Sequence, residues 1–294
     1  MISLGSVEAF LEERYPIERA DSEREFYDLW RRYGLNDLPP IEMAIAGALI
    51  ADRLPWVFAS GYQATLRNAF PALPPQGWAA FAATEDSHDP EAHPGTRLSN
   101  DGDDFYLNGN KSWVGHSKVL DHLIITVNDP GGDKYKAQGM IVARGAKGVT
   151  LTHREEPKFL KAMSQGFANF TNTPVKKNQV FKFEPIRQFG RSEAKFVTLA
   201  ATAFMLARSR NDANFADRLI TVASGLTALI SEEKTSRQVY GALDREFQRC
   251  VDYFETSADT SAIADYTADQ RMFRMYTDRI QRRVGYARSE AGLS

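Results

Sequence analysis

The sequence has a single cysteine, Cys250, in a chain of 294 residues. One cysteine cannot form an internal disulfide, and its place in an apolar helical pattern marks it as a core residue rather than a nucleophile. No stretch approaches the roughly 20 consecutive apolar residues that a transmembrane helix needs. The first residues carry acids and lack the long apolar run of a signal peptide. We therefore predict a cytoplasmic protein that does not enter a membrane.

Net charge is also small, because 36 Lys and Arg residues face 38 Asp and Glu residues and leave a formal charge of −2. This balance gives no attraction to nucleic acid or to an anionic membrane. His88 and His93 lie close together, but no further ligand set accompanies them and prolines interrupt the segment. We predict a surface loop there and no metal site. No internal repeat or low-complexity tract is evident.

Apolar spacing divides the chain into three parts, which we predict to be domains at residues 1–77, 78–185 and 186–294. The first reads as helices, including an apolar helix over residues 41–51 that follows Pro39-Pro40. The second has short apolar segments between Gly and Pro residues, with strands predicted at 120–127, 137–142 and 149–152. The third returns to helices with three apolar stripes. The predicted fold class is α+β, with a middle β-barrel or sandwich between an N-terminal helical domain and a C-terminal helical bundle.

The segment from Phe81 to His116 carries the most informative pattern. An apolar strand at 78–83 runs into the polar turn Thr84-Glu85-Asp86. Two turn signals follow, at Asp101-Gly102 and at Asn108-Gly109-Asn110. Short strands predicted at 105–107 and 111–114 flank the second turn. Asp-Gly and Asn-Gly between apolar segments are strong signals for β structure.

This segment resembles the middle domain of the acyl-CoA dehydrogenases. That family has a Thr-Glu-Pro turn after an apolar strand, then Asp-Gly, an aromatic residue, Leu-Asn-Gly-x-Lys and x-Trp-Ile-Thr. The matching residues here are Thr84-Glu85-Asp86, Asp101-Gly102, Tyr106, Leu107-Asn108-Gly109-Asn110-Lys111 and Ser112-Trp113-Val114-Gly115. The order of helical, β and helical parts is also the family's architecture. The resemblance implies FAD as cofactor, an acyl-CoA thioester as substrate and a role in fatty acid metabolism. It also implies a homodimer or homotetramer, with an electron-transfer flavoprotein as a partner.

The resemblance also implies roles for individual residues. Thr84 would hydrogen-bond the flavin edge, Trp113 would pack on the isoalloxazine, and Ser87 would reach a phosphate or the ring edge. Arg187, in Arg187-Gln188-Phe189-Gly190, matches an Arg-x-x-Phe-Gly element that contacts FAD across a subunit interface. Arg suits a diphosphate because its planar fork can bind it with two hydrogen bonds. From the residues alone, Thr84 reads as a turn hydroxyl, Trp113 as a core aromatic and Arg187 as part of a loop before a helix at Ser192.

Two positions depart from the family pattern. Gly115 stands where the family has Thr, which removes one expected hydrogen bond to the flavin. Asp86 stands where the family has Pro, and a carboxylate near a flavin diphosphate would repel it unless shielded.

The catalytic base is the largest departure, because the family's usual Tyr-Glu-Gly-Thr turn is absent. A minority of the family places the base at the start of the first helix of the last domain, which makes Glu193 the best single candidate. The alternative is that Ser192 caps a helix and Glu193 complements the helix dipole in its first turn. The function implied is FAD-dependent α,β-dehydrogenation of an acyl-CoA thioester. Two alternatives remain open: a non-catalytic scaffold or partner subunit, and a flavin-dependent monooxygenase on the same fold.

Overall fold

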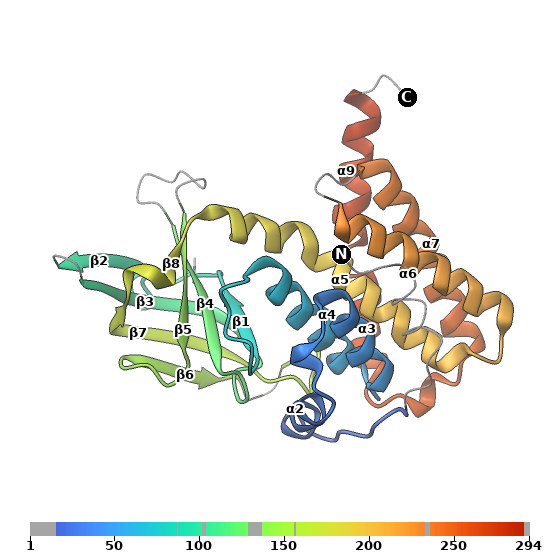
Figure 1. The fold of residues 1–294 in the computed structure, drawn as a ribbon, viewed down its shortest axis with the longest axis horizontal. Helices are drawn as coiled ribbons and strands as arrows, with labels where there is room; N and C mark the ends of the chain where they lie inside the picture. The colour runs from blue at the N-terminus through green and yellow to red at the C-terminus, as the bar shows by residue number, and fades with distance from the viewer. Residues whose placement is uncertain are drawn as a thin grey trace. The chain divides into compact units, whose positions relative to one another are not determined.

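The computed structural model describes residues 16–86, 88–101, 104–128, 137–155, 157–232 and 236–290, the last five as backbone only (Figure 1). The chain divides into two compact units. The helical unit comprises Met1–Asp21, Asp28–Thr65 and Arg191–Ser294, and the sheet unit comprises Ser22–Tyr27 and Leu66–Gly190. Ser87 and Gly102, to which we assigned a cofactor contact and a turn, lie outside the described residues. The three-domain division stays a prediction about chain order.

The helices follow the predicted apolar segments. Their bounds are α2 Glu23–Arg32, α3 Pro40–Ile50, α4 Leu54–Ala69, α5 Phe183–Ser209, α6 Ala213–Ser231, α7 Arg237–Ser257, α8 Tyr266–Asp269 and α9 Thr277–Glu290. Short 3₁₀ turns lie at Leu35–Asp37, Lys177–Gln179, Thr260–Ala262 and Gln270–Arg274. The helix predicted over 41–51 is α3, which has Pro40 at its first position, where a missing N–H costs nothing. Because α2, α4 and α5 span unit boundaries, each supplies residues to both units.

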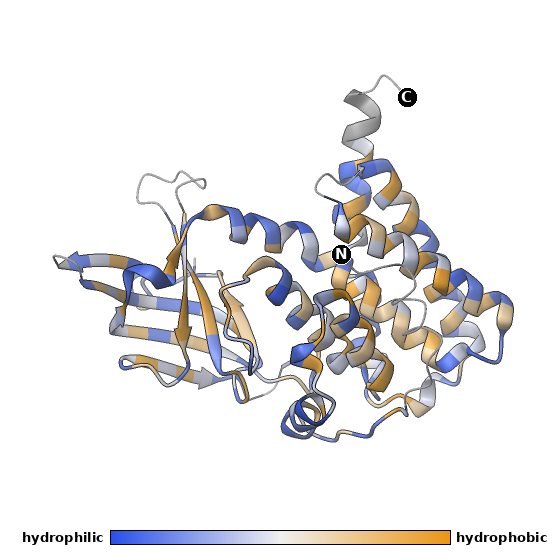
Figure 2. Ribbon diagram, viewed as in Figure 1, coloured by the Kyte–Doolittle hydropathy of each residue, from blue (hydrophilic) through white to orange (hydrophobic). Residues whose placement is uncertain are grey.

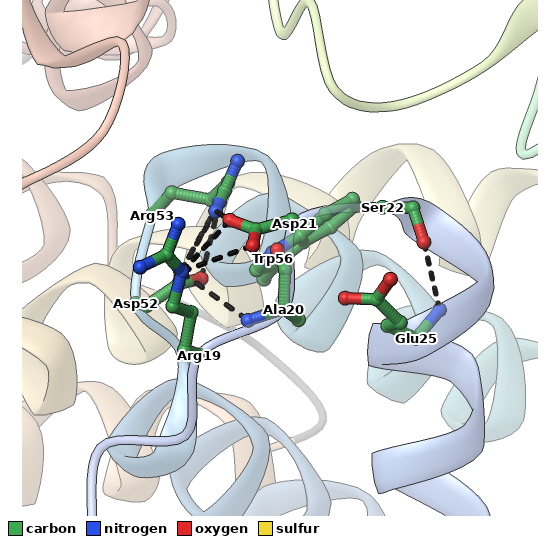
Figure 3. Close-up of polar contacts among 8 residues, drawn as sticks. All are labelled: Arg19, Ala20, Asp21, Ser22, Glu25, Asp52, Arg53 and Trp56. Carbon is green, nitrogen blue, oxygen red and sulfur yellow. Dashed lines mark hydrogen bonds and ion pairs between the residues drawn. The ribbon is translucent and has the colours of Figure 1, made fainter.

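A buried arginine joins the start of the helical unit to the turn between α3 and α4. Arg53 pairs with Asp21 at 3.0 Å and with Asp52 at 2.9 Å, and its side chain is 8% exposed (Figure 3). Beside it, the Trp56 indole N–H donates to the carbonyl oxygen of Ala20 at 3.1 Å. Two carboxylates satisfy the guanidinium charge, so we assign this cluster a structural role.

The sheet unit contains two four-stranded sheets within the described residues. The strands are β1 Ala79–Ala82, β2 Arg97–Asp101, β3 Asp104–Gly115, β4 His122–Val127, β5 Gln138–Ala143, β6 Val149–His153, β7 Gln165–Val175 and β8 Val180–Phe181. One sheet has the order β1-β4-β5-β8, with β1 and β4 parallel. The other has the order β2-β3-β7-β6 and is antiparallel throughout. The predicted strands at 120–127, 137–142 and 149–152 are therefore confirmed as β4, β5 and β6.

The core of the sheet unit gathers alternate residues from both sheets. Its buried members are Ala80, Ala82, Leu107, Val114, Leu120, Leu123, Ile125, Val127, Met140, Val142, Ala168, Phe170 and Val175. In Figure 2, β5 is coloured mainly apolar and β2 mainly hydrophilic. Phe81 points the opposite way from Ala80 and Ala82. Its ring lies 4.3 Å from the ring of Phe189 in α5 and 5.8 Å from that of Phe70, the residue after α4, so these two rings cover part of that face of the first sheet.

Strand β3 corrects one prediction. We expected two short strands around a turn at Asn108-Gly109-Asn110, but residues 104–115 form one continuous strand. The register with β7 shifts between Leu107 and Gly109, which is a bulge rather than a turn. Gly109 has φ 115°, and a side chain there would collide with the backbone of Gly95. Glycine suits this bulge because it has no Cβ. It can adopt a positive φ, and it lets the backbone of Gly95 approach closely.

Candidate functional site

The Thr84-Glu85-Asp86 turn lies beside β3, which brings the two halves of the sequence motif together. The Thr84 carbonyl accepts a hydrogen bond from the Ser112 N–H at 2.8 Å. The Thr84 side chain is exposed, and its neighbour Glu85 turns toward the space between the sheets. The backbone bond places Thr84 beside Ser112, the residue before Trp113. Thr84 and Trp113 are therefore close along the backbone, as expected if both contribute to one site.

Glu85 and Lys111, the Glu and the Lys of the sequence motif, form an ion pair with each other. The Lys111 side chain is fully buried, and its Nζ lies 2.7 Å from Glu85 Oε1. It also donates to the carbonyl of Ala83 at 3.2 Å. The same Glu85 oxygen accepts from the N–H and the hydroxyl of Thr96 at 3.0 and 2.9 Å. This buried ion pair fastens the turn after β1 to the middle of β3.

The pKa values of this pair reflect burial and mutual attraction. Burial lowers the pKa of Lys111, and the bond to Glu85 offsets only part of that effect. For Glu85, burial acts to raise the pKa, but Lys111 and Thr96 together hold it below its ordinary value. The Glu85 carboxylate is ionised at neutral pH, and its contact with Lys111 Nζ at 2.7 Å favours the charged form of the lysine, so we assign the pair a structural role.

Trp113 lies half-buried on the outer face of the β2-β3-β7-β6 sheet, at a second bulge of β3 between Lys111 and Val114. Its indole N–H lies 3.4 Å from Oε1 of Gln165 on β7. The ring lies over Gly115, because a Cβ added to Gly115 would be 3.1 Å from it. The indole therefore fills the space in which the family's Thr side chain would stand. Gly115 is a packing match to Trp113 as well as a lost hydrogen-bond donor.

A cavity of about 300 Å³ opens on the sheet unit next to the motif. Its lining residues are Asp86, His93, Asn110, Lys111, Ser112, Thr152, Phe167, Ala168 and Asn169. Asn110 and Ser112 lie on β3 with Trp113, and Phe167 and Asn169 lie on β7 with Gln165, so the cavity uses the two central strands of this sheet. The volume is at the lower end of the roughly 300–1,000 Å³ that small-molecule sites occupy. An aromatic floor with hydroxyl and amide groups around it suits a flat ligand with polar edges.

Charges at the cavity edge are partly satisfied by the protein. The Asp86 carboxylate accepts from the His88 N–H at 2.8 Å and from the Asp89 N–H at 3.4 Å. The His88 N–H is the main reason why the pKa of Asp86 lies below its ordinary value, and the rings of His93 and His88 add to it. Asp86 is thus ionised but shielded. Across the cavity, the Arg154 guanidinium lies 4.7 Å from the centre of the Phe167 ring.

Arg187 lies in a helix, not in the loop that we gave as an alternative. It belongs to α5, which begins at Phe183, and its guanidinium pairs with Glu184 at 2.5 Å. Phe189, the aromatic residue of the same element, is buried against Phe81. The Arg187 side chain is 39% exposed, so it can reach a ligand from solvent. Its assignment to FAD stays a prediction.

Glu193 lies in the helical unit, and its surroundings differ from the expected helix start. It comes ten residues after the first residue of α5, so Ser192 does not cap the helix and Glu193 does not face the N-terminal dipole. Burial raises the pKa of Glu193, while Arg279 and the Tyr276 hydroxyl favour its carboxylate form. A partly buried carboxyl of raised pKa has the properties of a general base.

A second buried network beside Trp113 was not predicted from the sequence. His116 follows Gly115, is fully buried and has φ 57°, a left-handed conformation that is rare outside glycine. Its Nδ1 lies 2.9 Å from Oε1 of Glu23, which is 6% exposed. Glu23 also accepts from the N–H and the hydroxyl of Ser164, the residue before Gln165. Backbone strain and a buried acid thus lie directly behind the Trp113 site.

Other classes of site find no support in the part of the chain that the structure describes. No group of three or more His, Cys, Asp and Glu side chains there could hold a metal ion. His88 and His93 are exposed, in agreement with the predicted loop. Among the described helices, none is both long enough and apolar enough to cross a membrane.

Comparisons with known proteins agree with this geometry. Residues 80–173 match the family model of the acyl-CoA dehydrogenase middle domain, a span that contains Thr84, Lys111 and Trp113. The fold is similar to that of an FAD-dependent dehydrogenase (15% identity, TM-score 0.71), covering 100% of this chain and 99% of that one. The fold is also similar to that of PigA with FAD and proline (14% identity, TM-score 0.66), over 100% of this chain and 99% of that one. Butyryl-CoA dehydrogenase from Megasphaera elsdenii is 11% identical with a TM-score of 0.60, over 90% of each chain.

The chain therefore has an acyl-CoA dehydrogenase-like fold, and the predicted arrangement of helical, β and helical parts is confirmed. No curated protein sequence matches the chain.

Proposed function

We propose that this protein binds FAD and uses it to dehydrogenate an acyl thioester between its α and β carbons. The observation that carries the proposal is the cavity of about 300 Å³ whose lining includes Asp86 and Ser112, which lie close in sequence to Thr84 and Trp113, within a fold similar along the whole chain to that of an FAD-dependent dehydrogenase.

The residues around the cavity fit a flavin ring. Asn110, Ser112, Thr152 and Asn169 offer hydrogen-bonding groups around the Phe167 ring, which matches a flat heteroaromatic with polar edges. The volume suits the ring system rather than the whole dinucleotide. Asp86, the expected obstacle to a diphosphate, has two backbone N–H partners and a nearby His93, which weaken its repulsion.

Bound FAD supplies the hydride acceptor that dehydrogenation requires. In this proposal Thr84 and Trp113 hold and orient the ring, and Arg187 contacts the diphosphate. Glu193 removes the proton from the α carbon of the thioester. Burial raises its pKa, which makes it a stronger base once ionised, and Arg279 keeps the ionised form accessible.

An absorption spectrum of the purified protein with added FAD tests the cofactor directly. Bound flavin supports the proposal, whereas a colourless protein that ignores FAD supports the non-catalytic alternative. Anaerobic mixing with a panel of acyl-CoA thioesters then tests the reaction. Bleaching of the flavin supports dehydrogenation; a flavoprotein that no thioester reduces supports the monooxygenase alternative.

Glu193→Gln tests the base. We expect flavin reduction to fall by at least about 10²-fold while FAD binding is kept, because the amide cannot accept the proton. Glu232→Gln is the matched control, since Glu232 is an exposed carboxylate of the same unit. Equal rates for the Glu193 variant and the control would remove Glu193 from the mechanism.

The resemblance also supports self-association and transfer of electrons to an electron-transfer flavoprotein. Light scattering on the purified protein measures the first, with a dimer or tetramer expected. Reoxidation of thioester-reduced flavin by that acceptor measures the second.

A further inference from the structure

One end of the sheet unit carries a cationic cluster that neither the motif nor the cavity uses. Lys118 follows β3 and is exposed, and Arg144 follows β5. The Arg144 guanidinium donates to the Lys118 carbonyl at 2.7 Å, which holds the two residues side by side. His153, the last residue of β6, lies at the same end, because its Nδ1 is 3.0 Å from the hydroxyl of Ser117, the residue before Lys118.

These charges have no anionic partner within the described residues. No ion pair is made there by Lys118 or Arg144, nor by the exposed Lys158 and Lys161 of the β6–β7 connection. Two acids in this part of the sheet unit, Asp121 and Glu23, are already engaged, whereas Glu155, the residue after Arg154, is exposed. Asp121 accepts from the Tyr27 hydroxyl at 2.7 Å and from the Trp78 N–H at 3.0 Å. Glu23 faces inward, bonded to His116 and Ser164.

The cluster is connected to the candidate site through the end of β3. The Lys118 N–H donates to the Ser164 hydroxyl at 2.9 Å, and the next residue, Gln165, lies against the Trp113 indole. Arg154 follows His153, and its guanidinium donates to the Ser112 carbonyl at 3.1 Å.

We propose that Lys118, Arg144 and His153 form a phosphoryl-binding site that holds the phosphorylated end of the substrate's pantetheine arm. This inference rests on the proposed function, since pantetheine is the arm on which acyl thioesters are carried. Arg144, held by its bond to the Lys118 carbonyl, and the exposed Lys118 supply the charge. Ser117 lies 3.0 Å from His153 Nδ1, which leaves Nε2 of the ring to face the phosphoryl oxygens.

The arm has two sources with the same chemistry. In free CoA the pantetheine ends in a diphosphate that bears a nucleotide, and on a carrier protein it ends in a single phosphodiester. The site is expected to recognise the phosphoryl group next to pantetheine in either case. Comparing the affinities of probes that differ only in phosphorylation therefore isolates the contribution of the phosphoryl group from that of the rest of the pantetheine arm.

The experiment measures equilibrium binding of CoA, 4′-phosphopantetheine and pantetheine to the full chain by calorimetry, with and without added FAD. Wild type should bind a phosphorylated probe at least about tenfold more tightly than pantetheine. In Lys118→Glu/Arg144→Glu that advantage should disappear, while pantetheine binding changes less than about twofold. Lys147→Glu, an exposed cation elsewhere on the β5–β6 connection, should behave as wild type.

The relative affinities of the three probes also identify the source of the arm and can refute the site. Tighter binding of CoA than of 4′-phosphopantetheine indicates free CoA as the source, and equal binding indicates a carrier-borne arm. Equal binding of all three probes to wild type, or an equal loss of pantetheine binding in the double variant, overturns the site. If the double variant does not fold, Lys118→Glu serves alone, because its side chain is exposed and makes no hydrogen bond or ion pair with the residues that the structure describes. A colourless protein that retains the phosphoryl preference would refute the proposed function and leave the site standing.

Discussion

The buried pair Lys111–Glu85 gives the sharpest test of how the sheet unit holds its site. We consider Glu85→Gln, Lys111→Met and the double variant. Lys111 is fully buried, whereas the Glu85 side chain is 27% exposed and keeps its bonds from Thr96. Removing Glu85's charge therefore strands a cation in the core. Removing Lys111 leaves an anion that retains other partners and some water.

The expected losses of unfolding free energy follow from that asymmetry. Breaking a buried pair and leaving a buried charge costs about 3–5 kcal/mol, which we assign to Glu85→Gln. Lys111→Met should cost about 1–3 kcal/mol, because Glu85 is still solvated and hydrogen-bonded. In the double variant no charge is buried, and glutamine still accepts from Thr96. Lys111→Met should thus destabilise the wild type but stabilise Glu85→Gln.

Urea denaturation measures the effect, since guanidinium would screen the pair. The pH dependence of the unfolding free energy provides a second test. Glu85 has a lowered pKa, so its contribution is present above the ordinary value of 4.5 and is lost as pH falls through the folded-state pKa. The pKa of Lys111 is also lowered, so stability rises with pH below its ordinary value of 10.5, and more steeply in Glu85→Gln. If Lys111→Met destabilises both backgrounds equally, the stranded-charge reasoning is wrong.

Three further outcomes are expected. Gly115→Thr places a side chain where the Trp113 indole now lies, so tryptophan emission should shift. FAD binding should weaken about tenfold or more. Unchanged emission would contradict the packing of the indole on Gly115. His116→Ala should be about 1 kcal/mol less stable to urea than His116→Gly, because both lose the bond to Glu23 but only alanine is strained at φ 57°; equal stability would exclude strain there. The rate of flavin reduction should fall as pH decreases through the raised pKa of Glu193, and a flat profile would exclude it as base.

The sequence predicted the order of elements well because hydrophobic period is a local property. The strands β4, β5 and β6 and the helix α3 lie within two residues of their predicted bounds. The Asn108-Gly109 signal was assigned to a turn, and the structure shows a positive φ at Gly109 within a bulged strand instead. A turn and a bulge place the same demand on one glycine, and only the partner strand β7 decides between them.

The start of α5 was misplaced for a related reason. Gly190 and Ser192 read as a loop and a cap, yet the helix begins at Phe183 and passes through both. Pro185 in its first turn was the available signal, since proline is tolerated there and not further along a helix. Packing of Phe189 on Phe81 stabilises this part of the helix, and that contact joins residues far apart in the sequence.

The polar networks could not be predicted at all. Glu23 and His116 are 93 residues apart, and Lys118 and Arg144 are brought together by the ends of β3 and β5. Single charged or polar residues carry no period, so their pairing depends on the completed fold. For the same reason, Glu85 and Lys111 could be recognised as motif members without their bond being foreseen.

Gly115 illustrates how a departure from a motif should be judged. By sequence it removes a hydrogen-bonding side chain, which favours a lost activity. In the structure the Trp113 indole lies over this glycine, within 3.1 Å of where a Cβ would stand. A glycine and an adjacent large ring then form one unit, and neither can be changed alone without a clash or a void. The missing threonine is therefore compatible with an altered flavin contact, and a loss of activity would have to follow from the missing Tyr-Glu-Gly-Thr base instead.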